Sequence, residues 1–552
     1  MKNKKIAALM LVTALTASMF TGCGASEQKQ ESAVQSSEKE SNAVEAVVST
    51  VVEEESKGYD GMDNLQVSEE PVTVTMHYTF GGNGAPTGDT PIWQEIAKIT
   101  NVSMENVANP SISDEGQAIN TMLASGELPD IITANATNMS SVVSQGALIP
   151  LDDLIAEYAP NIQKFLEDYP EAVASGTGAD GQIYLLSGTL GGEAGQTLPS
   201  MGLFIRMDWI EKLNLEVPTT LEEFEEVLYA FRNDDPNGNG IQDEIPYFYR
   251  DKGIHTLYQF WNAYRNFYID GDDGKVHYGP AEEEYKNALT DLTRWYADGI
   301  IDPEIFTRGS QARQELLGND IGGCTIDWFA STGQMNDTLK ETVPDMDFAA
   351  IAPPADVNGV VKLNQGRSAL HSVKIGISVN CEDPVTVIKF LDFCYTQTGS
   401  RLLRCGIEGT DYTVEDGKIQ VTEYAMNAHS AGYPNYLRTI GGYEFAAYGN
   451  LESEKSSMNK WAREGFELYE NSDWVQEQFP SLSFTEEEQK VIDNCYVNIT
   501  TMVDEYEQSV LLGSTDLNST WEKHLEELNA VGLQELLAAY NSAYERYLAT
   551  IE

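Results

Sequence analysis

The chain has 552 residues, and its 87 Asp and Glu against 34 Lys and Arg give a formal net charge of -53. One hydrophobic core rarely serves a chain of that length, so we expect two large lobes. The strong negative charge repels phosphates and anionic headgroups, which excludes nucleic-acid binding and peripheral adsorption to membranes as functions.

The amino terminus has the layout of a secretory signal peptide. Lysines precede an uncharged, largely apolar run from Ile6 to Phe20, and Thr21-Gly22-Cys23 forms a small-residue cleavage site. The cysteine after Gly22 resembles the lipobox of bacterial lipoproteins, in which that thiol receives a diacylglyceryl group. We therefore predict a signal peptide over residues 1–22, lipidation of Cys23 and a location on the extracytoplasmic face of the cell membrane. A plain secreted protein is the alternative.

Residues 23–70 are predicted to be an acidic, disordered tether, because Ser, Glu, Gln and Lys dominate and no helical or strand period persists. The cysteines that follow Cys23 are odd in number and show no CxxC spacing. The sequence therefore predicts neither a disulfide framework nor a zinc or redox dithiol site.

The folded body begins at Pro71 with strands and helices in alternation. Val72, Val74 and Met76 alternate with polar residues, as in a half-buried strand, and a helix is expected around residues 92–97. A second strand ends at Ile132 and is expected to run into a polar loop over residues 133–141. In α/β sheets, loops at the carboxyl ends of strands line the ligand crevice.

The chain is expected to pass between the lobes more than once. The first crossing is placed after the predicted strand at residues 182–185, and a strand at residues 373–378 followed by a helix at residues 385–395 returns to the first lobe. The carboxyl terminus reads as helical, with a core-facing stripe from Leu533 to Tyr544. We predict a first lobe of residues 71–190 and 370–412, and a second lobe of residues 191–369 and 413–552.

Several runs in the chain carry a family resemblance. They are Leu203–Leu213, Val217–Phe224, Asp235–Pro246, Gly146–Leu154, Gly299–Glu304 and Gly406–Tyr412. Together they are similar to extracellular solute-binding protein family 1, which includes maltose-binding and alginate-oligosaccharide-binding proteins, and to its lipoprotein members in Gram-positive bacteria. The resemblance covers Pro71 to the end of the chain. It implies an α/β, two-lobed type II periplasmic-binding fold with a hinge, a sugar ligand and delivery of that sugar to an ABC permease.

A loop in the second lobe has the oxygen pattern of a calcium site. Side-chain oxygens at positions 1, 3 and 5 come from Asp235, Asn237 and Asn239, and Gly240 supplies the turn at position 6. An EF-hand closes with Glu at position 12, which here is Pro246, so this loop is not an EF-hand. The resemblance implies that the closing ligands are the Ile241 carbonyl, Asp243 and Glu244. We predict a structural Ca²⁺ that braces the second lobe, and the alternative is an Asx-rich turn.

Candidate sugar contacts are polar and aromatic residues at strand ends, because sugars offer hydroxyls to polar groups and C–H faces to rings. Asp327 and Trp328 follow an apolar strand around residues 321–326 and are the strongest candidates. The remaining candidates are Trp261, Tyr264, Arg206, Asn135 and Tyr436. With 10% aromatic residues in the chain, each ring is also a candidate for the core.

The sequence indicates a binding protein and not an enzyme. It has no GxSxG elbow, HExxH helix or GxxxxGK loop, and its histidines have no metal-ligand spacing. We expect no catalytic residue, and we expect a monomer whose partners are a sugar, the permease and, through its anchor, the membrane. Two alternatives remain open: a receptor for a peptide or another solute, and a surface glycan hydrolase that uses two carboxylates.

Overall fold

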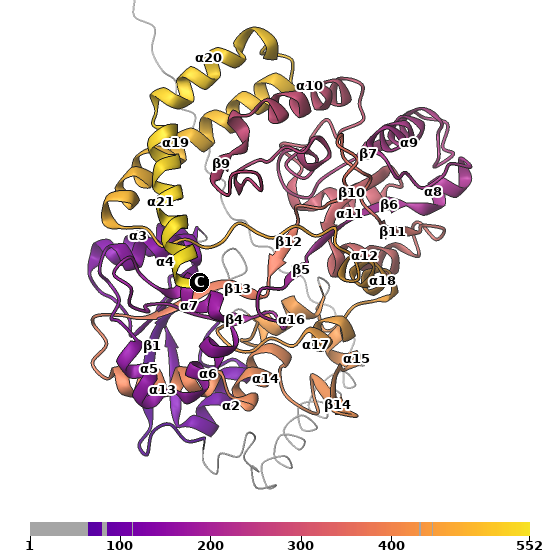
Figure 1. The fold of residues 1–552 in the computed structure, drawn as a ribbon. Coiled ribbons are helices and arrows are strands. Elements are labelled where there is room, and N and C mark those ends of the chain that lie inside the picture. The colour runs from indigo at the N-terminus through magenta and orange to yellow at the C-terminus, as the bar shows by residue number, and fades with distance from the viewer. Residues whose placement is uncertain (1–64, 80–85, 113, 430–431, 444, 552) are drawn as a thin grey trace, which may run out of the picture. The chain divides into compact units, whose positions relative to one another are not determined.

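The computed structural model describes residues 65–79, 86–112, 114–429, 432–443 and 445–551 (Figure 1). These residues belong to one compact unit, Tyr59–Glu552. The predicted signal peptide, Cys23 and most of the predicted tether lie outside them. Among the helices of the described residues, none combines the length and apolar character needed to cross a membrane.

The first sheet has the strand order β2-β1-β3-β13-β4. Its strands are β1 (Val72–His77), β2 (Val102–Asn106), β3 (Ile131–Asn135), β4 (Leu186–Thr189) and β13 (Leu370–Ile377). β1 pairs in parallel with β2 and β3, whereas β13 runs antiparallel to β3 and β4. In Figure 1 the orange β13 lies among purple strands, so the later chain returns to the first sheet as the sequence predicts.

Helices bury the faces of this sheet. α2 (Pro91–Thr100) begins with proline at its first turn and ends at Asn101, whose φ of 61° is in the left-handed region. Trp93 of α2 packs on Phe390 of α13 (Pro384–Cys394) and on Phe445. The polar run at residues 133–141 is not the predicted loop. Thr133 to Asn135 extend β3 because they pair with β13, and Ala136–Ser144 form α4.

The second sheet has the order β11-β6-β10-β7. Its strands are β6 (Met201–Arg206), β7 (Ile245–Tyr247), β10 (Gly322–Trp328) and β11 (Phe348–Ile351). β10 runs antiparallel to β6 and parallel to β7. A separate core packs against it, with Phe204, Trp209, Phe231 and Trp295 fully buried. Two sheets with two cores agree with the expectation of two lobes.

Short strands carry the chain between the two sheets. β5 (Thr197–Pro199) lies between β4 and β6 in the chain, β12 (Gly366–Ser368) lies between β11 and β13, and β5 and β12 pair antiparallel. The predicted boundary at residue 412 needs a correction. Phe445, Ala446 and Ala447 belong to the core of the first sheet, so residues up to 447 do not all belong to the second lobe.

The carboxyl-terminal helices, yellow in Figure 1, confirm the predicted helical terminus. α19 (Glu486–Leu511) begins with a capping box between Thr485 and Glu488. The buried Glu507 of α19 accepts hydrogen bonds from Tyr258 and Tyr285 at 2.6 and 2.8 Å. α20 (Leu517–Ala530) follows, and α21 (Leu533–Ile551) contacts both α7 (Pro170–Gly176) and β9 (Val276–Tyr278).

The remaining elements connect or cover these sheets. The helices are α3 (Glu115–Ser125), α5 (Asp152–Tyr158), α6 (Pro160–Asp168), α8 (Met207–Lys212), α9 (Leu221–Asn233), α10 (Glu283–Ala297), α11 (Ala312–Gly318), α12 (Phe329–Leu339), α14 (Gln397–Cys405), α15 (Glu423–Asn427), α16 (Tyr433–Thr439), α17 (Leu451–Ser456) and α18 (Lys460–Glu470). Short 3₁₀ helices are η3 (Tyr258–Trp261), η4 (Gly279–Ala281) and η5 (Gly309–Gln311). Two hairpins are β8 (Phe267–Ile269) with β9, and β14 (Tyr412–Glu415) with β15 (Lys418–Val421).

Candidate functional site

The edges of the two sheets nearest to the crossing strands can be identified from strand pairing. Leaving the first sheet, the chain passes Thr189, which pairs with Leu370, and Asn135 lies nearby opposite Val373. It enters the second sheet at Met201, which pairs with Trp328. Residues at these strand ends therefore occupy the edges that the crossing strands connect, where an α/β protein binds its ligand.

Asp327 and Trp328 lie at the last two positions of β10 and differ in exposure. The Trp328 side chain is 40% exposed, whereas Asp327 is completely buried. The Asp327 carboxylate accepts a 2.7 Å hydrogen bond from the Trp328 amide and faces Arg313 Nε at 3.2 Å and Arg250 at 3.8 Å. Burial raises the pKa of Asp327, and the two guanidiniums oppose that shift. The Trp328 ring is thus available as a stacking surface, and the residue before it holds a buried carboxylate that faces two arginines.

Trp261 is a core residue in this structure. Its ring is 5% exposed and meets the Trp295 ring edge-on at 5.4 Å between centroids. Its Nε1 donates a 2.8 Å hydrogen bond to Asp291. Tyr264 is half-buried and stacks on Tyr268 with centroids 3.9 Å apart. The structure therefore does not bring Trp261 and Trp328 together on one exposed surface.

Arg206 lies at the opposite end of β6 from the strand end that meets Trp328. In the pairing with β10, Met201 faces Trp328 and Ile205 faces Cys324, so Arg206 lies level with the start of β10. Its buried guanidinium pairs with Asp208 at 2.6 Å and with Asp320 at 2.7 Å. The expected position of Arg206 beside the crevice is therefore corrected to the far edge of the second sheet.

Asn135 and Tyr436 both make hydrogen bonds within the protein. Asn135 caps α4 by accepting a 3.0 Å hydrogen bond from the Asn138 amide, and its side-chain amide donates to Glu115. Asn135 is thus the last residue of β3 and does not lie in the loop predicted after Ile132. Tyr436 is 8% exposed and donates a 2.7 Å hydrogen bond to Asp411. That contact is structural, and it directs the hydroxyl inward.

Two arginines of this site escaped the sequence analysis. Arg250 follows β7 at its carboxyl end and is 33% exposed, while Arg313 of α11 is mostly buried and donates to Ser331 and Thr332 at 2.6 and 2.8 Å. Arg250 carried a usable signal, because it follows the apolar strand at Ile245–Tyr247. Arg313 carried none, because it lies in a helix distant from Asp327 in the sequence.

The predicted calcium loop joins α9 to β7 and folds around its own oxygens. Asn239 donates to the Asp243 carboxylate at 3.1 and 3.2 Å, and the Gly240 amide donates to Asp235 at 3.0 Å. Asp235 and Gly240 have φ values of 47° and 79°, which produce the tight turn. Asn237 donates to the Asp320 carbonyl at 3.0 Å, so the loop is tied to the start of β10.

Glu244 is the unusual residue of this loop. It is 1% exposed, and within the described part of the chain neither of its carboxylate oxygens has a hydrogen-bond partner. One carboxylate oxygen of Asp235, Oδ1, is also buried without a hydrogen-bond partner among the described residues. Burial raises the pKa of Glu244, with Asp243 and Asp235 adding to the shift. Unpartnered buried carboxylates are costly, and a hard cation with oxygen ligands would satisfy them.

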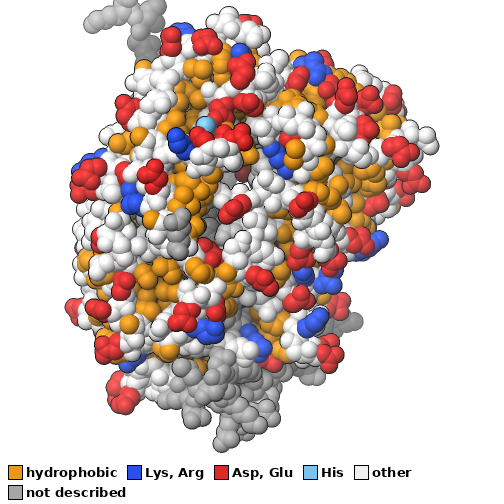
Figure 2. Space-filling view, in the orientation of Figure 1, with side chains coloured by type: hydrophobic (Ala, Val, Ile, Leu, Met, Phe, Trp, Pro, Cys, Tyr) orange, Lys and Arg blue, Asp and Glu red, His pale blue; other side chains and the backbone are white. Residues whose placement is uncertain are grey.

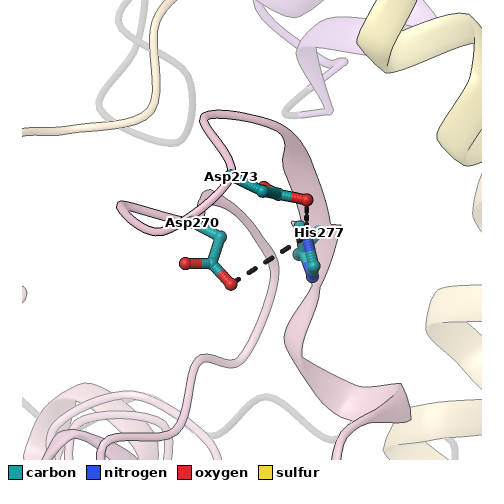
Figure 3. A group of neighbouring side chains, drawn as sticks. All are labelled: Asp270, Asp273 and His277. Atoms are coloured by element: carbon teal, nitrogen blue, oxygen red, sulfur yellow. Dashed lines mark hydrogen bonds and ion pairs between the residues drawn. The ribbon is translucent and has the colours of Figure 1, made fainter.

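A second acidic group lies at the hairpin between β8 and β9. The side chains of Asp270, Asp273 and His277 have potential metal-ligand atoms that all lie within 4.8 Å of one another. Among the described residues, this is the one group of three or more His, Cys, Asp or Glu side chains that are so close together. Figure 3 shows dashed lines that join the His277 ring to both carboxylates, with Nε2 at 3.3 Å from Asp273 and 4.0 Å from Asp270. The other ring nitrogen faces Glu282 at 3.1 Å.

Acidic side chains are spread over the surface drawn in Figure 2, and basic ones are sparse. This distribution agrees with the net charge of -53. In contrast, two arginines, Arg250 and Arg313, face the single carboxylate of Asp327 at the end of β10.

Comparison with known proteins gives a consistent result. The family described as bacterial extracellular solute-binding protein matches residues 85–400, and a domain of unknown function matches residues 480–549. The fructooligosaccharide ABC transporter substrate-binding protein FusA of Streptococcus pneumoniae is 24% identical over 461 residues, covering 79% of this chain and 84% of FusA. Lipoprotein LipO of Bacillus subtilis is 25% identical over 352 residues, covering 60% of this chain and 66% of LipO.

A solved structure extends this similarity to the fold. Alginate-binding protein AlgQ2, crystallised without calcium ion, is 30% identical with a TM-score of 0.77, covering 87% of this chain and 99% of AlgQ2. The similarity confirms the predicted α/β fold with two lobes.

Proposed function

Because this chain belongs to the family of bacterial extracellular solute-binding proteins, whose match spans residues 85–400, we propose that it captures an oligosaccharide outside the cell and delivers it to an ABC permease. The observation that supports a sugar is the exposed Trp328 ring at a strand end, directly after Asp327 and the two arginines that face it. A ring of that kind stacks on the C–H face of a pyranose, while charged neighbours bind hydroxyls. Neighbouring crossing strands fit a hinge that closes on the ligand.

The test is binding of a panel of oligosaccharides and peptides to the mature chain, followed by thermal shift and calorimetry. A ligand that binds only the folded state raises the Tm by mass action. We expect a sugar to raise the Tm and to be recovered unaltered. Trp328→Ala should weaken its binding about tenfold. Tyr424→Ala, which removes a ring that is 61% exposed on α15, is the control and should leave binding unchanged. Peptide binding, or recovery of a cleaved sugar, would replace this proposal with a peptide receptor or a hydrolase.

We also propose that the loop from Asp235 to Glu244 holds a structural Ca²⁺. The support is the buried, unpartnered carboxylate of Glu244 together with the oxygens of Asp235, Asn237, Asn239, Asp243 and the Ile241 carbonyl. The ion would satisfy these oxygens and fix the connection between α9 and the second sheet.

The location follows from the sequence. We propose that residues 1–22 are removed and that lipidated Cys23 holds the protein on the outer face of the cell membrane as a monomer. Similarity to a lipoprotein of Bacillus subtilis supports the anchor. Cys23→Ala should release the protein into the culture medium, and retention on the membrane would count against lipidation.

A further inference from the structure

We propose that the sugar is acidic and that Arg250 binds its carboxylate while Trp328 stacks on its ring. This inference rests on the proposed sugar-binding function and adds the chemical class of the ligand. Its basis is an arginine whose hydrogen-bonding capacity is almost unused and whose guanidinium faces Asp327, the residue before the exposed Trp328 at the end of β10.

The buried Asp327 is compensated without Arg250. Arg313 Nε lies 3.2 Å from Asp327 Oδ2, and the Trp328 amide donates to Oδ1 at 2.7 Å. Arg250 reaches Oδ1 only at 3.8 Å, which is beyond hydrogen-bond length. Among the described residues, this long ion pair is the one polar contact recorded for the Arg250 side chain. Its planar set of N–H donors therefore remains available, and a carboxylate is the group that matches it best.

The local charge supports the same ligand. Two guanidiniums face one buried carboxylate, so the group of Arg250, Arg313 and Asp327 carries a positive charge in a chain whose net charge is -53. Asp251 lies next to Arg250 in the sequence, but it is exposed to solvent and therefore screened. A neutral sugar would gain little from this charge, whereas a uronic acid would gain a charge-assisted contact.

Another arginine near the crossing strands shows the contrast. Arg367 of β12 meets both oxygens of Glu454, at 2.6 and 2.7 Å, and is largely buried. Its charge is neutralised within the protein. Arg250 differs from Arg367 because it is partly exposed and its one recorded ion pair, to Asp327, is 3.8 Å long, so its guanidinium can receive a ligand.

The test compares matched sugars by calorimetry on the mature chain: uronic-acid oligosaccharides against the same oligosaccharides with their carboxyl groups reduced to alcohols. We expect each uronate that binds to do so at least about tenfold more tightly than its reduced counterpart, with a preference that falls as salt rises. Arg250→Gln should abolish the preference and Arg250→Lys should keep part of it. Arg294→Gln, at an arginine that is 43% exposed on α10, is the control and should keep all of it.

The outcomes separate the two proposals. Neutral sugars that bind as tightly as uronates would overturn the acidic ligand, and a uronate preference unchanged in Arg250→Gln would overturn the assignment of Arg250 as the residue that binds the carboxylate. Either result leaves the sugar receptor intact. Failure of every saccharide, with binding of another solute, would overturn the proposed function itself. An unchanged Tm without ligand shows that Arg250→Gln is folded and that its loss of preference is local.

Discussion

Two segments of the second lobe carry clustered acidic residues in the sequence, but their carboxylates have different surroundings in the structure. The loop from Asp235 to Glu244 contains a carboxylate that is buried without a hydrogen-bond partner, at Glu244. The hairpin group of Asp270, Asp273 and His277 is partly exposed, and its carboxylates already face a ring nitrogen. Closeness of carboxylates alone would select the hairpin. The loop is the better candidate for a cation site, because the buried Glu244 carboxylate has no hydrogen-bond partner among the described residues. The hairpin carboxylates are partly exposed, so solvent and His277 already solvate them.

The largest expected effect is the stabilisation of the folded protein by Ca²⁺ bound in the loop. A ligand that binds only the folded protein, at a concentration a hundredfold above its Kd, stabilises it by about 3 kcal/mol. We therefore expect the Tm of the chelator-treated protein to rise by several degrees with Ca²⁺ and to fall again with excess chelator. Differential scanning calorimetry measures the shift, with Mg²⁺ as the control for ionic strength. No response to calcium would remove the metal from the loop.

Glu244→Gln should reverse the response. Without calcium the variant should be at least as stable as the unsubstituted chain, because it no longer buries an unpaired charge. With calcium it should lose the several-degree rise, because a neutral amide is a poor substitute for a carboxylate ligand. The variant should therefore have the equal or higher Tm without calcium, and the unsubstituted chain should have the higher Tm with calcium. A variant that keeps the calcium shift would contradict the assignment of Glu244 as a ligand.

The hairpin provides the matched comparison. Asp270→Asn and Asp273→Asn, singly or together, should leave the calcium-induced rise in Tm unchanged and should cost less than about 1 kcal/mol of stability. Loss of the rise in either variant, with retention in Glu244→Gln, would transfer the metal from the loop to the hairpin.

Sequence reasoning predicted the elements well where the pattern is local. The strand at Val72 and the helix around residues 92–97 follow from the spacing of apolar residues over a few positions. The polar segment at residues 133–141 was assigned incorrectly, because its regular structure comes from pairing with β13. Such long-range pairing leaves no mark on the segment itself.

In the candidate site, too, the positions set by local sequence were predictable and those set by long-range packing were not. The positions of Asp327 and Trp328 at a strand end were predictable, because an apolar strand followed by polar and aromatic residues is a local signal. The burial of Trp261 against Trp295 was not, because exposure depends on what packs above a ring. Arg206 was placed at the wrong edge, since a strand's two ends look alike until its partners and direction are known.

The smallest expected effect concerns the pH dependence of the hairpin. Burial lowers the pKa of His277, but hydrogen bonds to Glu282 and Asp273 outweigh it, and the pKa ends above its usual value. A histidine with a raised pKa in the folded state stabilises the protein fully below its unfolded pKa of about 6.5 and loses that contribution as the pH rises through the raised value. His277→Gln should therefore cost stability at acidic pH and little at alkaline pH.

The magnitude is limited by exposure, since the His277 side chain is 33% exposed and its partners Asp270, Asp273 and Glu282 are also reached by solvent. We expect a difference below about 1 kcal/mol between pH 5.5 and pH 9 in calcium-free urea titrations of the two proteins. Lys275 lies in the same hairpin, and Lys275→Gln is the control for the loss of a positive charge there. If the loss of stability caused by His277→Gln grew as the pH rose, His277 would be neutral in the folded protein. The hairpin carboxylates would then have no protonated histidine beside them, and the contrast with the loop would fail.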